Sequence, residues 1–396
     1  MFKKRFSLPT LSVLLILSVL LTFQITFVTM REEYDRKLKE QQLESPDEAE
    51  KLAHIIQLIR NYSIYDIDPN LPADKAIAAY LSSTGDRYAY YYTAKEYAKY
   101  LAANNGNQSG IGITVIDCEQ GLTITSVKLS SPAEKAGLKA GDCITDINET
   151  TLAGKDYAAK TNLLIGKTTD TFVLTVLRDN NELVFTLKPA VYESPSVIGS
   201  LLPDGKTGLV RIENFINDTE ELFKQITSNL KKKGAKQFIY DLRGNPGGSL
   251  TSVVAVLDYL LPKGIVVTLE NYDGSKNEYT SDDNSFDYPA VILVNKNTAS
   301  AGELFASCMR DYNAAILMGE TTYGKGVAQS FFTLPDGSAI KFTTAKYYSP
   351  HTKNYDGVGL SPDISISCPT DLTDFAHSVY ETDPQMQAAV AHLNKS

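Results

Sequence analysis

The fold is decided by the stretch Gln237-Phe238-Ile239-Tyr240-Asp241-Leu242-Arg243-Gly244-Asn245-Pro246-Gly247-Gly248. Its first six residues are mostly apolar, which is typical of a strand buried on both faces. The paired glycines end that strand in a loop where backbone amides can approach a ligand closely. Apolar residues at helical spacing follow from 253 to 260. A buried strand, a glycine loop and a helix in this order favour a mixed α and β fold.

A second strand and helix follow the same order further along the chain. The apolar run 290–294 predicts another buried strand, and the apolar residues 304, 305, 308 and 309 predict a helix that begins at Ala301. Ser300 therefore lies where a strand gives way to a helix, and free N–H groups there favour a developing oxyanion. Gly247 and Gly248 are natural donors to the same oxyanion. The alternative is that these glycines serve only a tight turn.

A serine hydroxyl needs a base, and the histidines of this chain are poorly placed to supply one. His54, His351, His377 and His392 fall in a helical run, a turn and the terminal segment. Lys325, by contrast, lies between two glycines, twenty-five residues after Ser300. A lysine can act as the base if its amine is kept neutral. The spacing therefore favours a Ser-Lys pair over a Ser-His-Asp triad.

Gln329 supports this interpretation of Lys325. The residues after Lys325 alternate like a strand, and if the extended segment runs unbroken, the side chains of Lys325 and Gln329 leave the same face. The amide oxygen of Gln329 is then placed to orient the amine. The competing interpretation is a solvated lysine at a hairpin tip.

Residues 319–326 are also close to the phosphate-binding loop G-x-x-x-x-G-K-[ST]. They depart from it because Gly326 has no hydroxyl for magnesium and because a strand follows instead of a helix. A nucleotide hydrolase is therefore disfavoured, and we expect neither a cofactor nor a metal.

From about residue 51 to about residue 393, the chain resembles the carboxyl-terminal processing peptidases, also called tail-specific proteases. The resemblance is carried by Gly85-Asp86-Arg87-Tyr88, the 241–248 loop, the Ser300 and Lys325 segments, residues 357–363 and residues 383–389. It implies a crotonase-like α/β protease core and a homodimer through terminal helices. It also implies the site residues: Ser300 as nucleophile, Lys325 as general base, Gln329 as its orienting partner, Gly247 or Gly248 with Ala301 as oxyanion hole, and Glu303, Asp311 and Thr322 as supporting residues.

The segment 131–144, together with Gly110-Ile111-Gly112-Ile113, resembles a PDZ domain. Such domains bind a peptide as an added strand and capture its terminal carboxylate in a loop of backbone N–H groups. The resemblance implies a peptide site made by Ser109, Gly110, Ile111, Gly112, Ile113, Leu163 and Leu164, although any of the apolar residues could simply be core. Many relatives carry arginine where this chain has Ile165, so the sequence leaves open whether peptide binding activates the enzyme by the route that uses this arginine.

The N-terminus predicts a membrane anchor. Residues 8–30 are nearly all apolar and follow Lys3, Lys4 and Arg5, without an Ala-x-Ala cleavage site. We expect a single-pass protein of the cell membrane with most of the chain outside the cytoplasm. The net charge of −9 and the absence of basic clusters argue against nucleic-acid binding. Cys118 and Cys143 fall in the PDZ segment and either pair or remain thiols.

The expected organisation is an anchor (1–30), a helical region (31–94), a PDZ domain (95–190), a serine protease core (191–370) and a helical tail (371–396). The predicted function is a membrane-anchored serine endopeptidase that binds protein substrates by their free C-terminal tails and cleaves them. The alternative is an inactive, PDZ-bearing binding or scaffold protein.

Overall fold

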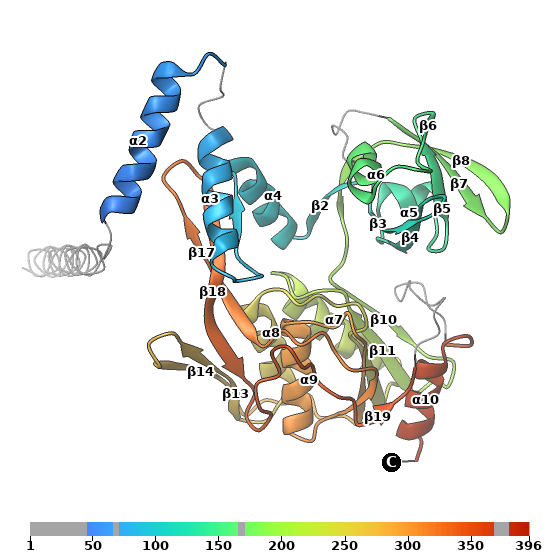
Figure 1. Ribbon diagram of the computed structural model, residues 1–396. Coiled ribbons are helices and arrows are strands. Elements are labelled where there is room, and N and C mark those ends of the chain that lie inside the picture. Colours follow the sequence, from blue (N-terminus) through green and yellow to red (C-terminus); the bar gives the residue numbers. More distant parts are fainter. Residues whose placement is uncertain (1–45, 66–70, 165–170, 368–379, 396) are drawn as a thin grey trace, which may run out of the picture. The chain divides into compact units, whose positions relative to one another are not determined.

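The computed structural model describes residues 46–65, 71–164, 171–367 and 380–395 (Figure 1). The chain divides into two units, one ending at Lys75 and the other running from Ala76 to the C-terminus. In the first unit, part of the region expected to be helical (31–94) forms α2 (Pro46–Tyr62), whose residues Leu52, Ile55 and Leu58 are exposed. The predicted anchor lies outside the described residues. Within the described ranges, no helix is both long and apolar enough to cross a bilayer.

The second unit is built around a six-stranded sheet in the order β10-β11-β12-β15-β16-β19. Its strands are β10 (Val197–Leu201), β11 (Thr207–Ile212), β12 (Gln237–Asp241), β15 (Ala290–Val294), β16 (Ile316–Gly319) and β19 (Ile364–Ser365). All neighbouring pairs are parallel except β10 with β11. The two apolar runs picked out in the sequence are thus central strands, and every residue of β12 and β15 is buried.

Helices cover both faces of this sheet. Phe238, Tyr240 and Ile292 point to the face covered by α7 (Thr219–Lys232), α8 (Leu250–Leu260) and α9 (Ala301–Asp311). Ile239 and Val291 point to the opposite face, where they pack with α10 (Pro384–Leu393). Successive residues of these strands face opposite sides of the sheet, and both sides are covered, so the strands consist of unbroken runs of apolar residues. The predicted mixed α and β fold is confirmed.

A second, antiparallel sheet carries the residues that follow Lys325. Its order is β1-β18-β13-β14, with β17 also paired to β18. The strands are β1 (Tyr90–Tyr92), β13 (Gly264–Asn271), β14 (Lys276–Ser281), β17 (Val327–Thr333) and β18 (Ala339–Tyr348). Helix α3 (Leu71–Ser83) precedes β1, and α4 (Ala94–Asn104) follows it. The β1–β18 pairing brings a segment near residue 90 beside one near residue 340.

The region predicted to be a PDZ domain forms a separate small sheet in the order β3-β4-β5-β7-β8, with β6 beside β5. Its elements are β3 (Ile113–Cys118), β4 (Gly121–Val127), α5 (Pro132–Ala136), β5 (Cys143–Ile147), β6 (Thr150–Thr151), α6 (Tyr157–Leu164), β7 (Phe172–Arg178) and β8 (Asn181–Leu187). The paired strands β2 (Asn107–Gly110) and β9 (Ala190–Glu193) connect it to the rest of the unit. It has its own apolar core, which includes Leu122, Ile144 and Leu174.

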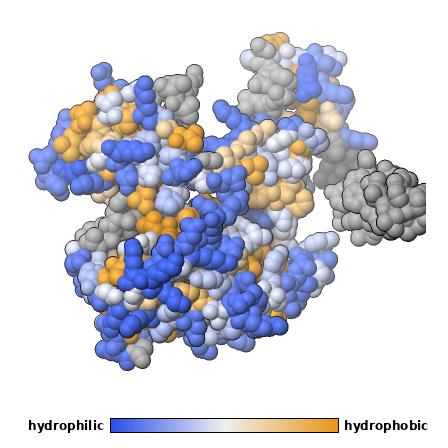
Figure 2. Space-filling model, turned by 180° about the vertical axis from the view of Figure 1, so that it is seen from behind, coloured by the Kyte–Doolittle hydropathy of each residue, from blue (hydrophilic) through white to orange (hydrophobic). Residues whose placement is uncertain are grey.

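Hydrophilic side chains cover much of the surface in Figure 2, with smaller apolar patches between them. The apolar residues of the two central strands, β12 and β15, do not contribute to this surface, because they are buried in the two hydrophobic cores on either face of the sheet.

Candidate active site

Ser300 lies at the junction predicted from the sequence, between β15 and α9. Its backbone has φ 54° and ψ −118°, which is unusual for a residue other than glycine. Such strain persists only where surrounding contacts hold the residue. Here the Ser300 N–H donates to Glu303 Oε2 at 2.9 Å, and the Ser300 carbonyl accepts from the Leu304 N–H at 2.9 Å.

The glycine loop after β12 approaches Ser300 closely. A Cβ on Gly247 would lie 2.7 Å from Ser300 Cβ and 2.9 Å from the Ala301 nitrogen, so only glycine fits. The Gly247 N–H, however, donates to Asn245 Oδ1 at 2.7 Å. Among the described residues, the N–H groups of Gly248 and Ala301 have no protein acceptor. Gly248 and Ala301 are therefore the better placed of the predicted oxyanion donors, and Gly247 allows the close approach.

Lys325 lies in the loop between β16 and β17 and is half-buried. Its carbonyl accepts a hydrogen bond from the Tyr347 hydroxyl. Burial lowers the pKa of the Lys325 amine, the positive charges of Lys341 and Arg87 lower it further, and the carboxylates of Asp356 and Asp86 oppose the shift. The surroundings thus favour the neutral amine that a lysine base requires.

Glu303 connects the two loops. Its fully buried carboxylate accepts from the Thr322 hydroxyl at 2.5 Å and the Gly324 N–H at 2.7 Å on Oε1. On Oε2 it accepts from the Lys325 N–H at 2.8 Å and the Ser300 N–H at 2.9 Å. One carboxylate therefore holds the backbone of both predicted catalytic residues.

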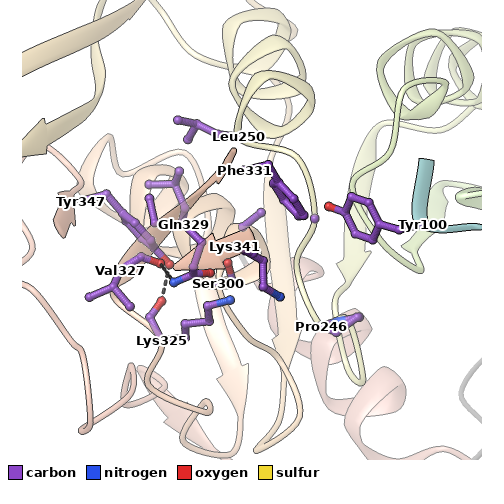
Figure 3. Close-up of a pocket in the computed structure, with 14 residues that line it drawn as sticks. Tyr100, Pro246, Leu250, Ser300, Lys325, Val327, Gln329, Phe331, Lys341 and Tyr347 are labelled. Carbon is purple, nitrogen blue, oxygen red and sulfur yellow. Dashed lines mark hydrogen bonds between the residues drawn. The ribbon is translucent and has the colours of Figure 1, made fainter. Parts of the chain in front are cut away.

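Ser300, Lys325 and Gln329 line one pocket of about 220 Å³. Figure 3 shows their side chains gathered around it with Lys341 and Tyr347, while Tyr100 and Phe331 face each other at one side. The pocket is lined by Tyr100, Pro246, Gly248, Leu250, Ser300, Ala301, Leu304, Lys325, Val327, Ala328, Gln329, Phe331, Lys341 and Tyr347.

The structure brings these side chains together without joining them. In the part of the chain described, no hydrogen bond links the Ser300 hydroxyl to the Lys325 amine. Gln329 Nε2 instead donates to Thr343 Oγ1 at 3.2 Å and to the Val327 carbonyl at 3.4 Å. Catalytic hydrogen bonds are often long before substrate binds, so this arrangement is compatible with the predicted pair.

The other predicted residues divide into those at the site and one that lies elsewhere. Thr322 is buried, binds Glu303 and also accepts from the Leu360 N–H at 2.7 Å. Asp311 ends α9, about 16 Å along the helix from Ser300. It accepts hydrogen bonds from the backbone of His351 and Thr352 and does not line the pocket. The structure thus places Asp311 as a support of the 351–352 loop instead of the site.

Of the histidines that the structure describes, at 54, 351 and 392, none lines the pocket, and His377 lies outside the described residues. Sequence reasoning missed Tyr347, a buried residue of β18 whose hydroxyl also contacts the Ser300 side chain. Burial holds the pKa of Tyr347 well above its ordinary value, so the hydroxyl keeps its proton and remains a donor. In the sequence, the strand-like alternation of residues 339–348 is the only pattern that could have indicated a buried side chain at Tyr347.

The predicted peptide site lies along β3, an edge strand of the small sheet. The N–H groups of Ile111 and Gly112 have no acceptor in the described part of the protein, as a carboxylate-binding loop requires. Ser109 and Gly110 pair with β9, and the Ile111 side chain belongs to the core. Ile113, Leu163 and Leu164 are partly buried against that core. Ile165 lies outside the described residues.

A buried charge pair supports the glycine loop. Asp241, at the end of β12, binds Arg243 at 2.7 Å, and Arg243 binds Asp383 at 2.7 Å at the start of α10. Burial opposes the charge of Asp241, but the adjacent cations of Arg243 and Arg211 hold its pKa below the usual range. The C-terminal helix is therefore tied to the loop that carries Gly248.

Comparison with known proteins agrees with this architecture. Residues 206–366 match peptidase family S41, and residues 109–188 match a PDZ domain. A "Probable CtpA-like serine protease" of Staphylococcus aureus (strain N315) is 31% identical over 323 residues, 81% of this chain and 65% of that protein. A protein of the same name from Staphylococcus epidermidis (strain ATCC 35984) is 33% identical over 74% of this chain and 60% of its own length. The chain thus spans less than two thirds of these relatives.

Two solved structures share the fold. The photosystem II D1 C-terminal processing protease is 26% identical, with a TM-score of 0.54 over 78% of this chain and 86% of that one. An S41 protease structure from Bacteroides fragilis NCTC 9343 is 18% identical, with a TM-score of 0.60 over 86% of this chain and 97% of its own. The second likeness concerns the fold alone. By sequence and by fold, this chain therefore contains a peptidase family S41 region at residues 206–366 and a PDZ domain at residues 109–188.

Proposed function

We propose that this chain is a serine endopeptidase of the C-terminal processing type, with Ser300 as nucleophile and Lys325 as general base. The observation that carries the proposal is the Glu303 carboxylate, whose Oε2 accepts from the Ser300 and Lys325 amides at 2.9 and 2.8 Å. With both backbones held by one atom, the hydroxyl and the amine share a pocket.

In the proposed reaction, the neutral Lys325 amine takes the Ser300 proton while Ser300 Oγ attacks the scissile carbonyl carbon. The oxyanion accepts hydrogen bonds from the Gly248 and Ala301 N–H groups. The lysine ammonium then gives its proton to the leaving amine as the C–N bond breaks, which leaves an acyl-enzyme. Water then attacks the ester carbonyl carbon while Lys325 takes its proton. The bond between the acyl carbon and Ser300 Oγ breaks as the lysine ammonium returns a proton to Oγ, which releases the new carboxyl group and restores the hydroxyl and the neutral amine.

The deciding experiment is cleavage of an unfolded polypeptide by purified protein. We expect Ser300→Ala and Lys325→Ala to abolish turnover while circular dichroism shows that they remain folded. Matched controls are Ser82→Ala and Lys263→Ala, because both side chains are exposed and distant in sequence from the pocket residues. Normal turnover by either pocket variant would disprove the Ser-Lys pair. Absence of turnover in the unaltered protein would favour the inactive scaffold.

The PDZ domain is proposed to capture the free C-terminal tail of the substrate at the β3 edge. The unpaired amides of Ile111 and Gly112 support this, since such a loop binds a terminal carboxylate. A peptide with a free C-terminus should bind with higher affinity than the same peptide amidated. Equal affinities, measured by calorimetry with the Ser300→Ala variant, would contradict carboxylate capture.

Anchoring in the cell membrane, with the bulk of the chain outside the cytoplasm, is proposed on the apolar residues 8–30 alone. Membrane fractionation and exposure to external protease of intact cells test both the anchor and its orientation. A homodimer is proposed on the resemblance to relatives that dimerise through terminal helices. Analytical ultracentrifugation of residues 31–396 tests it, and a monomer at micromolar concentration would count against it.

A further inference from the structure

The segment Gly85-Asp86-Arg87-Tyr88 has no role in the mechanism above, yet it lies against the Lys325 loop. The ring centroid of Tyr88 lies 4.6 Å from Lys325 Nζ. The Arg87 guanidinium lies 4.7 Å from the same centroid, and its Nη2 lies 3.5 Å from the Gly324 carbonyl oxygen. The Tyr88 ring is thus contacted by two cations: Arg87, its neighbour in the sequence, and Lys325, which comes from a distant loop.

Asp86 fixes this segment to the strand behind the pocket. Its carboxylate accepts from the Thr343 N–H at 2.6 Å and from the Thr343 hydroxyl at 3.1 Å. It also accepts from the Tyr88 N–H at 2.9 Å, which sets the start of the turn that presents the ring. The hydroxyl of Thr343 is also the acceptor of Gln329 Nε2. The segment therefore reaches both Lys325 and Gln329.

An aromatic face is a suitable neighbour for an amine that must change its charge. A carboxylate at this distance would strongly favour the ammonium form. A ring face attracts the ammonium more weakly, yet still limits where the long lysine side chain can go. The Tyr88 side chain is half-buried, so it also shields one side of the amine from water.

We propose that Tyr88 is a positioning residue for Lys325, holding the amine beside Ser300 through its ring face, with Asp86 anchoring the ring to β18. The inference rests on the proposed function, because it assigns Tyr88 a role only if Lys325 is the base. It adds a residue that precedes the PDZ domain to a site whose predicted catalytic residues lie between residues 300 and 329.

The pH dependence of cleavage tests this role, because a purely structural residue would leave the apparent pKa of the base unchanged. The groups that face Lys325 are Lys341 on β18, Arg87 and Asp86 in the segment, Asp356 in its loop, and Glu303 and Tyr347. None of these is altered in the variants below.

Tyr88→Leu removes the ring but keeps an apolar neighbour. Since the ring favours the charged form, its loss should lower the pKa of Lys325 and move the rise of kcat/KM to lower pH by about half a unit. We also expect kcat to fall about tenfold, because the amine loses a contact that places it. Tyr88→Phe keeps the ring and should restore both. Tyr80→Leu, an exposed tyrosine of α3, is the matched control.

Should Tyr88→Leu not fold, Tyr88→Trp still decides the matter, since indole binds cations best and should move the profile to higher pH. The proposal is overturned if the profile of the folded Tyr88→Leu or Tyr88→Trp variant coincides with that of the unaltered protein. If Lys325→Ala is inactive while these profiles coincide, only the role of Tyr88 is refuted and the Ser-Lys pair stands. Activity in Lys325→Ala would instead refute the proposed function.

Discussion

Replacing Glu303 by glutamine is the most informative single change, because the carboxylate accepts hydrogen bonds only. Each of its oxygens takes two donors: the Thr322 hydroxyl and Gly324 N–H on one, the Lys325 and Ser300 N–H groups on the other. Glutamine offers one oxygen and one NH₂ group. In either orientation of the amide, its NH₂ group faces two N–H or O–H donors, which then lose their acceptor. Because the side chain is fully buried, water does not replace that acceptor.

The cost can be estimated from these bonds. A hydrogen bond to a charged group contributes about 1.5–3 kcal/mol, so losing two costs about 3–6 kcal/mol. Relaxation of the two loops should bring the measured value toward about 3 kcal/mol, still a large share of the roughly 5–15 kcal/mol that stabilises a domain. Activity should fall at least about a hundredfold, because a displacement of about 1 Å between reacting groups has that effect.

Urea unfolding followed by circular dichroism measures the first quantity, and peptide cleavage at a temperature where the variant stays folded measures the second. Glu278→Gln, on the exposed face of β14, is the isosteric control and should change neither. If Glu303→Gln unfolds at the same urea concentration as the unaltered protein and cleaves at a comparable rate, then the two loops are held by something other than this carboxylate.

Further changes test the pocket and the small domain. Lys341→Met removes a positive charge that lowers the pKa of Lys325, so that pKa should rise and the alkaline rise of kcat/KM should move to higher pH; a shift to lower pH would contradict the assignment. Tyr347→Phe deletes the hydroxyl that binds the Lys325 carbonyl and should reduce kcat by roughly five- to tenfold, or about 1 kcal/mol, with KM little changed. The Cys118 and Cys143 sulfurs lie 3.2 Å apart as free thiols, so oxidised glutathione should join them and raise the unfolding free energy of the domain by about 3 kcal/mol. Two thiols that still react with maleimide after this treatment would rule the bond out.

The elements nearest Ser300 were predictable because they are local in sequence. An unbroken apolar run can be buried on both faces only in a covered sheet, and β15 is such a strand. The change to helical spacing after Ser300 then fixed the start of α9 at Ala301. The strand character of β17 (Val327–Thr333) likewise followed from alternation, and both Gln329 in this strand and Lys325 in the loop before it line the pocket. These inferences needed no knowledge of distant contacts.

The residues that complete the pocket could not be found this way, because they come from far apart in the sequence. The chain has 23 tyrosines. The resemblance drew attention to the segment that ends in Tyr88, but no local pattern shows that Tyr88 or Tyr347 lies beside Lys325. Their positions depend on tertiary pairing: β1 joins β18, and Asp86 binds Thr343, which is 257 residues away. The same limit explains Gln329, whose amide donates to Thr343. The same-face argument required an unbroken strand from Lys325, whereas β17 begins at Val327 and its register shifts between Ala328 and Gln329.

A lysine base has a requirement that a histidine base lacks. Histidine carries its nitrogen on a rigid ring, whereas the lysine amine ends a flexible four-carbon chain that loses about 2 kcal/mol of rotamer entropy when it is fixed. The site meets this requirement by holding Lys325 at its N–H through Glu303, at its carbonyl through Tyr347 and at its amine through the Tyr88 ring. Because Glu303 also holds Ser300, the separation of the reacting groups depends on a buried oxygen instead of a direct bond between two mobile side chains. Among the described residues no hydrogen bond joins the Ser300 hydroxyl to the Lys325 amine, and catalytic hydrogen bonds of this kind often tighten only when substrate binds.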